Sequence, residues 1–167
     1  MKRVTTTFTL PCTAETFWSV FLDPAYTRAF YLDELHFKGL RVLESGETTR
    51  KLHITPRLNL PGPIARLVGD SFAYEEHGTL DRKTDTWSWR MVRPAGVGSS
   101  QKDLISTSGT TRIAPGGAGQ CRRTDDVTVE AHVFGLGGVI ESIVEKEMHS
   151  SWAREKAFFE RWLHKAP

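Results

Sequence analysis

The fold depends on the last long stretch of the sequence, LGGVIESIVEKEMHSSWAREKAFFERWL, at residues 136–163. This stretch contains no proline, and its two glycines, Gly137 and Gly138, lie in the first turn. At a rise of about 1.5 Å per residue, it predicts a helix of roughly 40 Å. Its apolar residues recur at helical spacing and form one broad face: Ile140, Ile143, Val144, Met148, Trp152, Phe158, Phe159, Trp162 and Leu163.

Alternating runs that precede this helix predict strands joined by hairpin turns. The β-branched residues 5–10 predict the first strand, with Phe8 and Leu10 on one face. Later runs are separated by turn residues such as Ser45-Gly46, which is typical of antiparallel hairpins. We expect six more strands at residues 36–44, 50–55, 72–80, 86–92, 104–113 and 121–134.

Two short helices are expected after the first strand. Pro11 ends that strand, and Thr13 is a suitable N-cap for a helix. The apolar face of this helix consists of Phe17, Trp18, Phe21 and Leu22. Asp23 and Pro24 then predict the start of a second helix, with Asp as the N-cap and Pro at the first helical position. The second helix carries Tyr26, Phe30 and Tyr31.

This order of elements predicts the fold class. An antiparallel sheet must bury one face, and the helix at residues 136–163 is the only long helix available to cover it. We therefore predict an α+β protein in which a curved antiparallel sheet of about seven strands wraps round the C-terminal helix. No internal repeat or linker divides the chain, so residues 1–167 are expected to form a single domain.

The composition excludes several classes of protein. Apolar residues make up 39% of the chain and charged residues 25%, as in an ordinary soluble globular protein. The formal net charge of +2 is too small to indicate nucleic-acid binding. No apolar run approaches the roughly 20 residues of a membrane span, and the N-terminus lacks the apolar part of a secretory signal. We therefore expect a cytoplasmic protein, in which Cys12 and Cys121 most often stay reduced although two cysteines can pair.

The motifs for nucleotide or metal binding are incomplete. Gly135, Gly137 and Gly138 follow a predicted strand, but they do not form the G-x-G-x-x-G pattern and no further strand completes a βαβ unit. Among the six histidines, none is spaced three or four residues from another. Glu145 and His149 share a helix face, but a zinc site needs three or four converging ligands. We expect neither a metal ion nor another cofactor.

The sequence leaves catalysis open as an alternative to binding. Cys121 stands beside Arg122 and Arg123, but Arg122 points to the opposite face of the strand and no histidine is near, so a structural thiol is favoured. General acid–base chemistry needs only one or two polar groups in an apolar cavity. The inward-facing candidates are Glu76, Arg123 and Asp125 on strands and His149 on the long helix. Charge pairs that merely close the end of a cavity are commoner than catalytic pairs. For this reason we favour a binding module over an enzyme.

Aromatic and methionine side chains provide the strongest indication of a site. Phe72 and Tyr74 share one face of a predicted strand. Trp87, Trp89 and Met91 share one face of the next strand, and Met148 and Trp152 lie on the middle of the long helix. Aromatic and methionine side chains form adaptable apolar walls. The alternative is that these side chains fill an ordinary core. The middle of the helix, residues 149–153, is too polar and small to pack a core tightly. We therefore predict a cavity of several hundred Å³ with Phe30 or Tyr31 near its mouth. The predicted ligand-binding residues are Phe30, Tyr31, Phe72, Tyr74, Trp87, Trp89, Met91, Met148 and Trp152.

Residues 60–68 are apolar where a surface connection is usually polar. Pro63 can begin a short helix there and Gly69 can end it. We predict a mobile lid over one end of the cavity, formed by Leu60, Pro61, Ile64 and Leu67; the alternative is a rigid plug, because the prolines stiffen the backbone. Positive charges exceed negative ones by three between residues 36 and 70, so we also predict transient contact with an anionic membrane. The basic residues in this range are Lys38, Arg41, Arg50, Lys51, Arg57 and Arg66.

Nearly the whole chain resembles the START-like (helix-grip, SRPBCC) superfamily, and in particular an uncharacterised bacterial family distantly similar to sterol-binding VASt domains. The resemblance implies the helix-grip fold and the binding, or binding and transport, of a lipid or sterol-like molecule. It leaves open a cyclase- or hydratase-like enzyme acting on a polyketide-type ligand, and a protein-interaction module with a dry core. The resemblance rests on Glu15-Thr16-Phe17-Trp18, Asp23-Pro24-Ala25-Tyr26, Leu60-Pro61-Gly62-Pro63-Ile64, Gly119-Gln120-Cys121-Arg122-Arg123 and Phe134-Gly135-Leu136-Gly137-Gly138-Val139-Ile140-Glu141.

Overall fold

The computed structural model describes residues 1–69, 72–94 and 104–165. The seven strands form one antiparallel sheet in the order β1-β7-β6-β5-β4-β3-β2. The elements follow one another as β1 (Lys2–Leu10), α1 (Ala14–Phe21), α2 (Pro24–Arg28), η1 (Ala29–Glu34), β2 (Gly39–Ser45), β3 (Thr49–Thr55), α3 (Gly62–Val68), β4 (Tyr74–Asp81), β5 (Thr86–Val92), β6 (Ile105–Gly117), β7 (Gln120–Ala131) and α4 (Gly137–Lys165).

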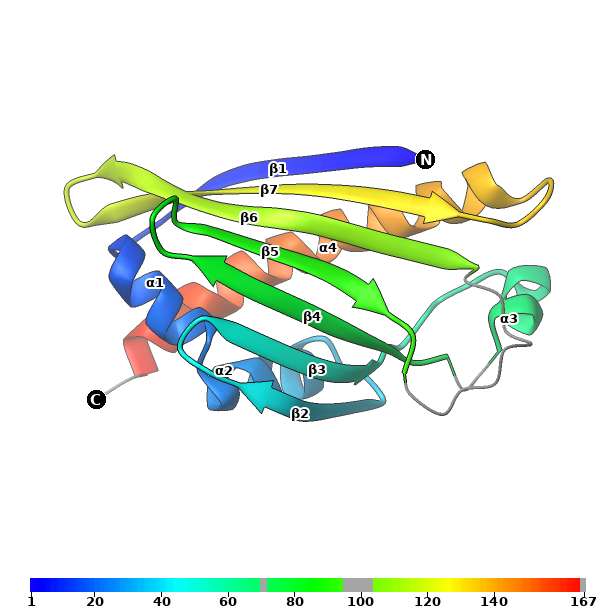
Figure 1. Ribbon diagram of the computed structural model, residues 1–167, viewed down its shortest axis with the longest axis horizontal. Coiled ribbons are helices and arrows are strands. Elements are labelled where there is room, and N and C mark those ends of the chain that lie inside the picture. The colour runs from blue at the N-terminus through cyan, green and yellow to red at the C-terminus, as the bar shows by residue number, and fades with distance from the viewer. Residues whose placement is uncertain (70–71, 95–103, 166–167) are drawn as a thin grey trace.

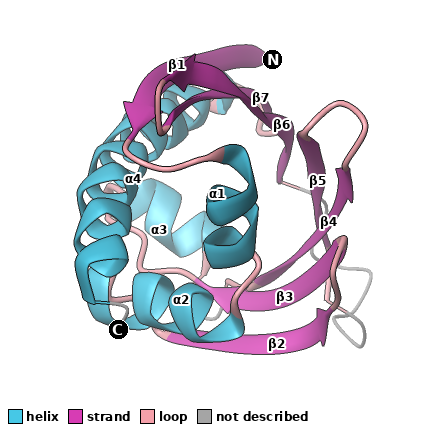
Figure 2. Ribbon diagram, turned by 90° about the vertical axis from the view of Figure 1, so that its left-hand side faces the viewer, coloured by secondary structure: helices cyan, strands magenta, loops and turns pink. Residues whose placement is uncertain are grey.

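The sheet curves round the long helix. Figure 2 shows the strands as an arc from β1 to β2, with α4 across the open side of the arc. Figure 1 shows α1 and α2 at one end of the sheet and α3 at the other. The predicted α+β class, the seven antiparallel strands and the covering C-terminal helix are therefore confirmed.

The two short helices begin where their capping residues predict. The Thr13 hydroxyl accepts a hydrogen bond from the Thr16 amide at 3.2 Å, and the Asp23 carboxylate accepts one from the Ala25 amide at 2.8 Å. Each cap satisfies a backbone N–H that the helix itself leaves free. Both predicted N-caps are confirmed.

The predicted strand at residues 36–44 is wrong at its start. After α2 the chain continues as the π-helix η1, and the Phe37 amide donates to a carbonyl oxygen within η1 at 3.0 Å. His36 has a φ of 55°, a left-handed conformation that interrupts an extended strand. For this reason β2 begins only at Gly39.

The predicted strand at residues 121–134 is too long. β7 ends at Ala131, and Phe134 is fully exposed in the connection to α4. The amide of Gly137 donates to the carbonyl of Val133 at 2.9 Å, so the chain turns here instead of extending the strand. The long helix then runs slightly past its predicted end.

Packed side chains fill the two ends of the space between sheet and helix. At the α1 end a large cluster includes Phe17, Trp18 and Phe159, all almost fully buried. At the α3 end, Ile64, Ile105 and Ile140 form the buried centre of a smaller cluster. The region between these clusters is where a ligand site can lie. Among the helices that the structure describes, none combines the length and apolar character needed to cross a membrane.

Gly78 provides a test of this packing, because the Trp87 ring lies directly over it. A Cβ atom at Gly78 would lie 1.9 Å from Cζ2 of Trp87, a buried residue. We expect Gly78→Ala to lower the free energy of unfolding by about 1–3 kcal/mol, as overpacking does in cores, when measured by denaturant titration. Gly138→Ala is the control, because a Cβ atom at Gly138 would meet no other atom within 4 Å. Equal stability of the two variants would contradict the packing of Trp87.

Candidate functional site

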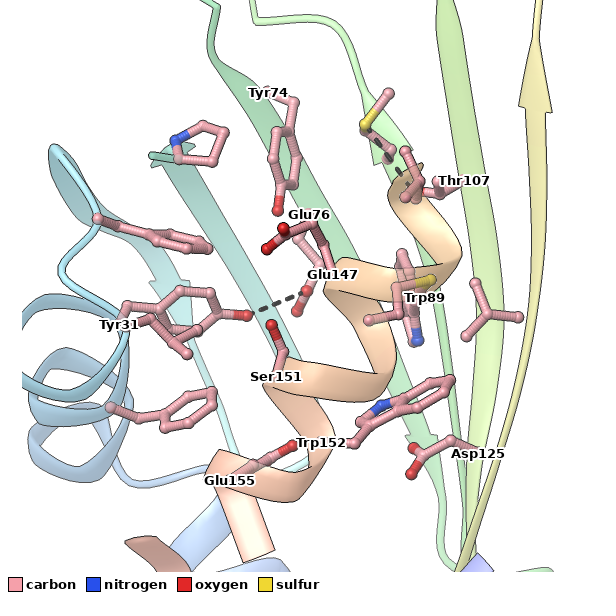
Figure 3. Close-up of a pocket in the computed structure, with 18 of the residues that line it drawn as sticks. Tyr31, Tyr74, Glu76, Trp89, Thr107, Asp125, Glu147, Ser151, Trp152 and Glu155 are labelled. Carbon is pink, nitrogen blue, oxygen red and sulfur yellow. Dashed lines mark hydrogen bonds between the residues drawn. The ribbon is translucent and has the colours of Figure 1, made fainter. Parts of the chain in front are cut away.

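A cavity of about 270 Å³ lies between the concave face of the sheet and α4 (Figure 3). Its walls come from α1, α2, η1, the strands β3 to β7, α4 and the segment at residues 56–60. The volume is just below the range of about 300–1,000 Å³ that is usual for small-molecule sites. The cavity can therefore hold a small ligand.

The structure places all nine predicted ligand-binding residues along this one cavity. Alternate residues of a strand share a face, so β5 directs three of them inward together. The helix adds two more, because side chains four residues apart lie one above the other. The nine are Phe30, Tyr31, Phe72, Tyr74, Trp87, Trp89, Met91, Met148 and Trp152.

The four residues predicted to form the lid have different positions. Leu60 lines the cavity, whereas Pro61 is exposed. Ile64 is only 3% exposed and packs in the cluster of Ile105 at the α3 end, which favours the rigid-plug alternative. The side chain of Leu67 lies outside the described residues.

Arg50, which the sequence analysis counted among the basic residues near the lid, faces the interior. It is 5% exposed, and its Nη2 lies 3.0 Å from Oε1 of Glu76. Its Nη1 donates to the Phe21 carbonyl at 2.7 Å, and the guanidinium stacks over the rings of Phe21 and Trp87 at 4.5 and 5.3 Å. The expectation that Arg50 contributes to a basic surface is wrong, because the buried carboxylate of Glu76 pairs with it.

The remaining basic surface near the lid is smaller than the sequence suggested. Lys51 pairs with Glu44 at 2.6 Å, so its charge is partly neutralised. Asp70 lies outside the described residues. Contact with an anionic membrane stays a prediction, and it now has fewer free charges to support it.

A second buried charge network lies on β7 and α4. The Nε of Arg123 lies 2.8 Å from Oδ2 of Asp125, and its Nη1 lies 2.9 Å from Oε1 of Glu155. The Thr111 hydroxyl donates to the other oxygen of Asp125 at 2.5 Å. Burial alone would lower the pKa of Arg123, but the charges of Asp125 and Glu155 raise it, so the guanidinium stays charged.

The long helix adds carboxylates that the sequence analysis did not select. Glu147, Ser151 and Glu155 recur every four residues and line the cavity beside the apolar row of Met148 and Trp152. Glu147 and Glu155 each lie four residues from Ser151, and this spacing could have shown that they share its face of the helix. Arg50 was also missed, although it lies two residues before Leu52 and four before Ile54 and so shares their inward face of β3.

The cavity therefore has two chemically different walls. Figure 3 shows Tyr31, Tyr74, Glu76, Glu147 and Ser151 gathered on one side, and Trp89, Thr107 and Trp152 on the other. On the polar wall, the Tyr31 hydroxyl donates to Oε2 of Glu76 at 3.5 Å, which is a long hydrogen bond. A ligand that fits both walls must itself be amphipathic.

Of the predicted acid–base candidates, Glu76, Arg123 and Asp125 line the cavity, but His149 does not. His149 is exposed, and its ring packs in a T-shaped arrangement with that of Trp152, with centroids 5.4 Å apart. It lies two residues from Glu147 and from Ser151, which turns it by about 200° away from the cavity face. The expectation that His149 faces inward is wrong.

Neither cysteine lines the cavity. Cys12 and Cys121 are buried free thiols with sulfurs 3.9 Å apart. Within residues 1–69, 72–94 and 104–165, no group of three or more His, Cys, Asp or Glu residues is arranged to hold a metal ion.

The Arg50–Glu76 pair can be tested by a double-mutant cycle. Removing one partner leaves a buried charge alone, so we expect Arg50→Met to lower the free energy of unfolding by about 3–5 kcal/mol. Adding Glu76→Leu should restore much of this loss. Lys51→Met, which removes the exposed neighbour of Glu44, should have a far smaller effect. A double variant that is no more stable than Arg50→Met would contradict the pairing.

All three tyrosines of the chain line the cavity, which predicts a dependence on alkaline pH. Burial raises the pKa of Tyr26, Tyr31 and Tyr74 above the ordinary value, and negative charges raise it further: Glu155 beside Tyr26, and Glu76 beside the other two. The native protein thus keeps protons that the unfolded chain releases above about pH 10. Stability should be complete below that pH and fall as the pH rises beyond it. Difference absorbance should show tyrosine ionisation coinciding with unfolding; free titration of any tyrosine near pH 10 in the folded protein would contradict this.

Comparison with solved structures shows the helix-grip fold. The protein TTHA0849 of Thermus thermophilus has a TM-score of 0.67 at 15% identity, over 99% of this chain and 100% of that one. Norcoclaurine synthase of Thalictrum flavum has a TM-score of 0.67 at 16% identity, and the match covers 99% of this chain and 87% of that one. The Zhui aromatase/cyclase of Streptomyces sp. R1128 has a TM-score of 0.62 at 16% identity, and the match covers 94% of this chain and 90% of that one. At these identities the likeness shows the fold alone.

These neighbours share the helix-grip fold that the sequence resemblance implied. The likeness to sterol-binding VASt domains has no support in these matches. No curated protein sequence matches the chain. The model of one family, described as "Protein of unknown function (DUF2505)", matches residues 5–163. The chain therefore belongs to the DUF2505 family.

Proposed function

We propose that this protein binds a small, partly hydrophobic molecule in the cavity between the sheet and α4. The observation that carries the proposal is the convergence of the nine predicted aromatic and methionine side chains on one cavity. Both ends of the same interior are packed with apolar clusters, so the cavity is a local feature and not a loosely packed core. This observation argues against the alternative of a dry-core interaction module.

The polar wall narrows the class of ligand. Buried carboxylates and hydroxyls that face an aliphatic chain would lose hydrogen bonds to water without replacing them. A sterol has a single hydroxyl and a fatty acid has its polar atoms at one end, whereas five polar side chains gather on one side of this cavity: Tyr31, Tyr74, Glu76, Glu147 and Ser151 (Figure 3). We therefore favour a compact aromatic or polyketide-type molecule with several polar groups over a lipid or sterol-like one. Transport of the ligand stays a prediction.

A second candidate is acid–base catalysis on such a ligand. The observation that favours it is the placement of Glu76, held by Arg50 on one oxygen and facing the cavity beside the Tyr31 hydroxyl with the other. A carboxylate and a hydroxyl in an apolar cavity are suitable to accept and donate a proton. Two neighbours of the same fold are named as a synthase and an aromatase/cyclase, which is consistent with this candidate.

Filling the cavity provides the test of binding. Ser151 lines the cavity and is half-buried, so Ser151→Phe should occupy the space and abolish binding with little loss of melting temperature. Ser150→Phe adds the same ring one residue away, at an exposed position, and should bind normally. The measurement is a titration with the neutral fluorescent probe N-phenyl-1-naphthylamine, followed by competition with a sterol, a fatty acid and 1-naphthol.

Saturable binding of the probe by the wild-type protein and by Ser150→Phe, but not by Ser151→Phe, would support the proposal. Displacement by 1-naphthol and not by the sterol or fatty acid would support the aromatic class. Equal binding by all three proteins would show that the probe binds outside the cavity, and no binding by the wild-type protein would contradict the proposed function.

A further inference from the structure

We propose that the cavity selects ligands that carry a protonated amine, held at the polar wall between Glu147 and Glu76. This inference rests on the proposed function, because it names the class of molecule that the same cavity would bind. It follows from three observations: the balance of charge in the cavity, the incomplete hydrogen bonding of its carboxylates and the apolar wall opposite them.

The charges that line the cavity do not balance. Of the described lining residues, two are cationic, Arg50 and Arg123, and four are anionic: Glu76, Asp125, Glu147 and Glu155. Both guanidiniums are already engaged, Arg50 with Glu76 and Arg123 with Asp125 and Glu155. Two carboxylates are therefore in excess, and a cationic group in the ligand would reduce that excess.

The carboxylate of Glu76 has one oxygen that is poorly satisfied. Glu76 is 9% exposed, and Arg50 occupies its Oε1. Among the described residues, the only partner of its Oε2 is the Tyr31 hydroxyl at 3.5 Å, which is at the long limit for a hydrogen bond. Buried carboxylate oxygens are normally fully hydrogen-bonded, so this atom can still accept a strong donor.

Glu147 faces the same part of the cavity from α4. In the part of the chain that the structure describes, its carboxylate has neither an ion pair nor a hydrogen bond. Figure 3 shows its side chain close to those of Tyr74 and Glu76, with Ser151 one turn further along the helix. An ammonium group donates three hydrogen bonds, so it can bind Glu147 and Oε2 of Glu76 together and still reach a hydroxyl oxygen.

A buried polar group deeper in the cavity wall is also unsatisfied. The Tyr26 hydroxyl is buried and has no hydrogen-bond partner among the described residues. It lies near enough to Glu155 for that charge to raise its pKa, after the larger effect of burial. The wall thus contains both excess negative charge and unused hydrogen-bonding capacity, which a polar, cationic ligand can satisfy.

The opposite wall favours an organic cation over a metal ion. Trp89, Met148 and Trp152 present aromatic and thioether surface to the same space. Such surface packs against the hydrocarbon part of an amine, and the indole faces attract the cation itself. The described acidic residues do not form a group suited to metal coordination.

Three ligands that share one aromatic body but differ in charge test the inference. We would measure the dissociation constants of 1-naphthylmethylamine, 1-naphthylmethanol and 1-naphthoate at pH 7 by calorimetry. The amine should bind about tenfold or more tightly than the alcohol, since hydrogen bonds between charged groups are the strong ones, and the carboxylate should bind least tightly.

The variant Glu147→Gln should remove most of the preference for the amine over the alcohol, because the amide keeps the size of the side chain and removes its charge. It should also leave the melting temperature unchanged, because Glu147 is exposed. Glu145→Gln is the matched control: it makes the same charge change on the same helix, but Glu145 pairs with Lys2 at the surface. This control should keep the full preference.

The outcomes separate this inference from the proposed function. If the alcohol binds and the amine binds no more tightly, the inference is overturned and the binding function stands. If the amine is preferred but Glu147→Gln keeps that preference, the placement of the amine is overturned. If none of the three ligands binds, both the inference and the proposed function are contradicted.

Discussion

The Arg50 guanidinium connects the short helices to the sheet. From β3 it donates to the carbonyl of Phe21 at the end of α1, lies 3.4 Å from the Thr27 hydroxyl of α2 and pairs with Glu76 on β4. It also lies over the rings of Phe21 and Trp87. Both terminal nitrogens of this buried guanidinium have partners, so a shift of the helices on the sheet would leave part of the charge unpaired. The same contacts hold the Glu76 carboxylate at the cavity.

The amphipathic cavity results from the different side-chain periodicities of the strands and of α4, which face each other. Strands place every second residue on the inner face, whereas α4 places every third or fourth residue there. On α4, the row of Val144, Met148 and Trp152 runs beside the row of Glu147 and Ser151. The cavity lies under both rows, so one helix supplies an apolar wall and a polar wall at once. A fully apolar helix face would have packed as an ordinary core against the sheet.

Several errors in the sequence analysis have a common physical cause. His149 was expected to face inward and Arg50 to face outward, and both expectations were wrong. Residue type suggested these positions, but the register of the helix and the strand decided them. A charged residue can lie inside when a partner from a distant part of the chain neutralises it, as Glu76 does for Arg50. The connection between β3 and β4, which includes α3, separates these two residues in the sequence, so their pairing was not visible in it.

The sequence by itself determined the fold class, the two helix caps and the aromatic residues of the cavity. These features depend on local periodicity, on capping by Thr13 and Asp23 and on the alternation within β5, all of which short segments encode. Only the tertiary structure decided the start of β2, the burial of Ile64 and the two-sided chemistry of the cavity. The burial of Ile64 depends on contacts of α3 with β6 and α4, and the two-sided cavity depends on η1, β4 and α4, which lie far apart in the sequence. The left-handed turn at His36, after η1, and the excess of carboxylates at the cavity are therefore features that only the tertiary structure shows.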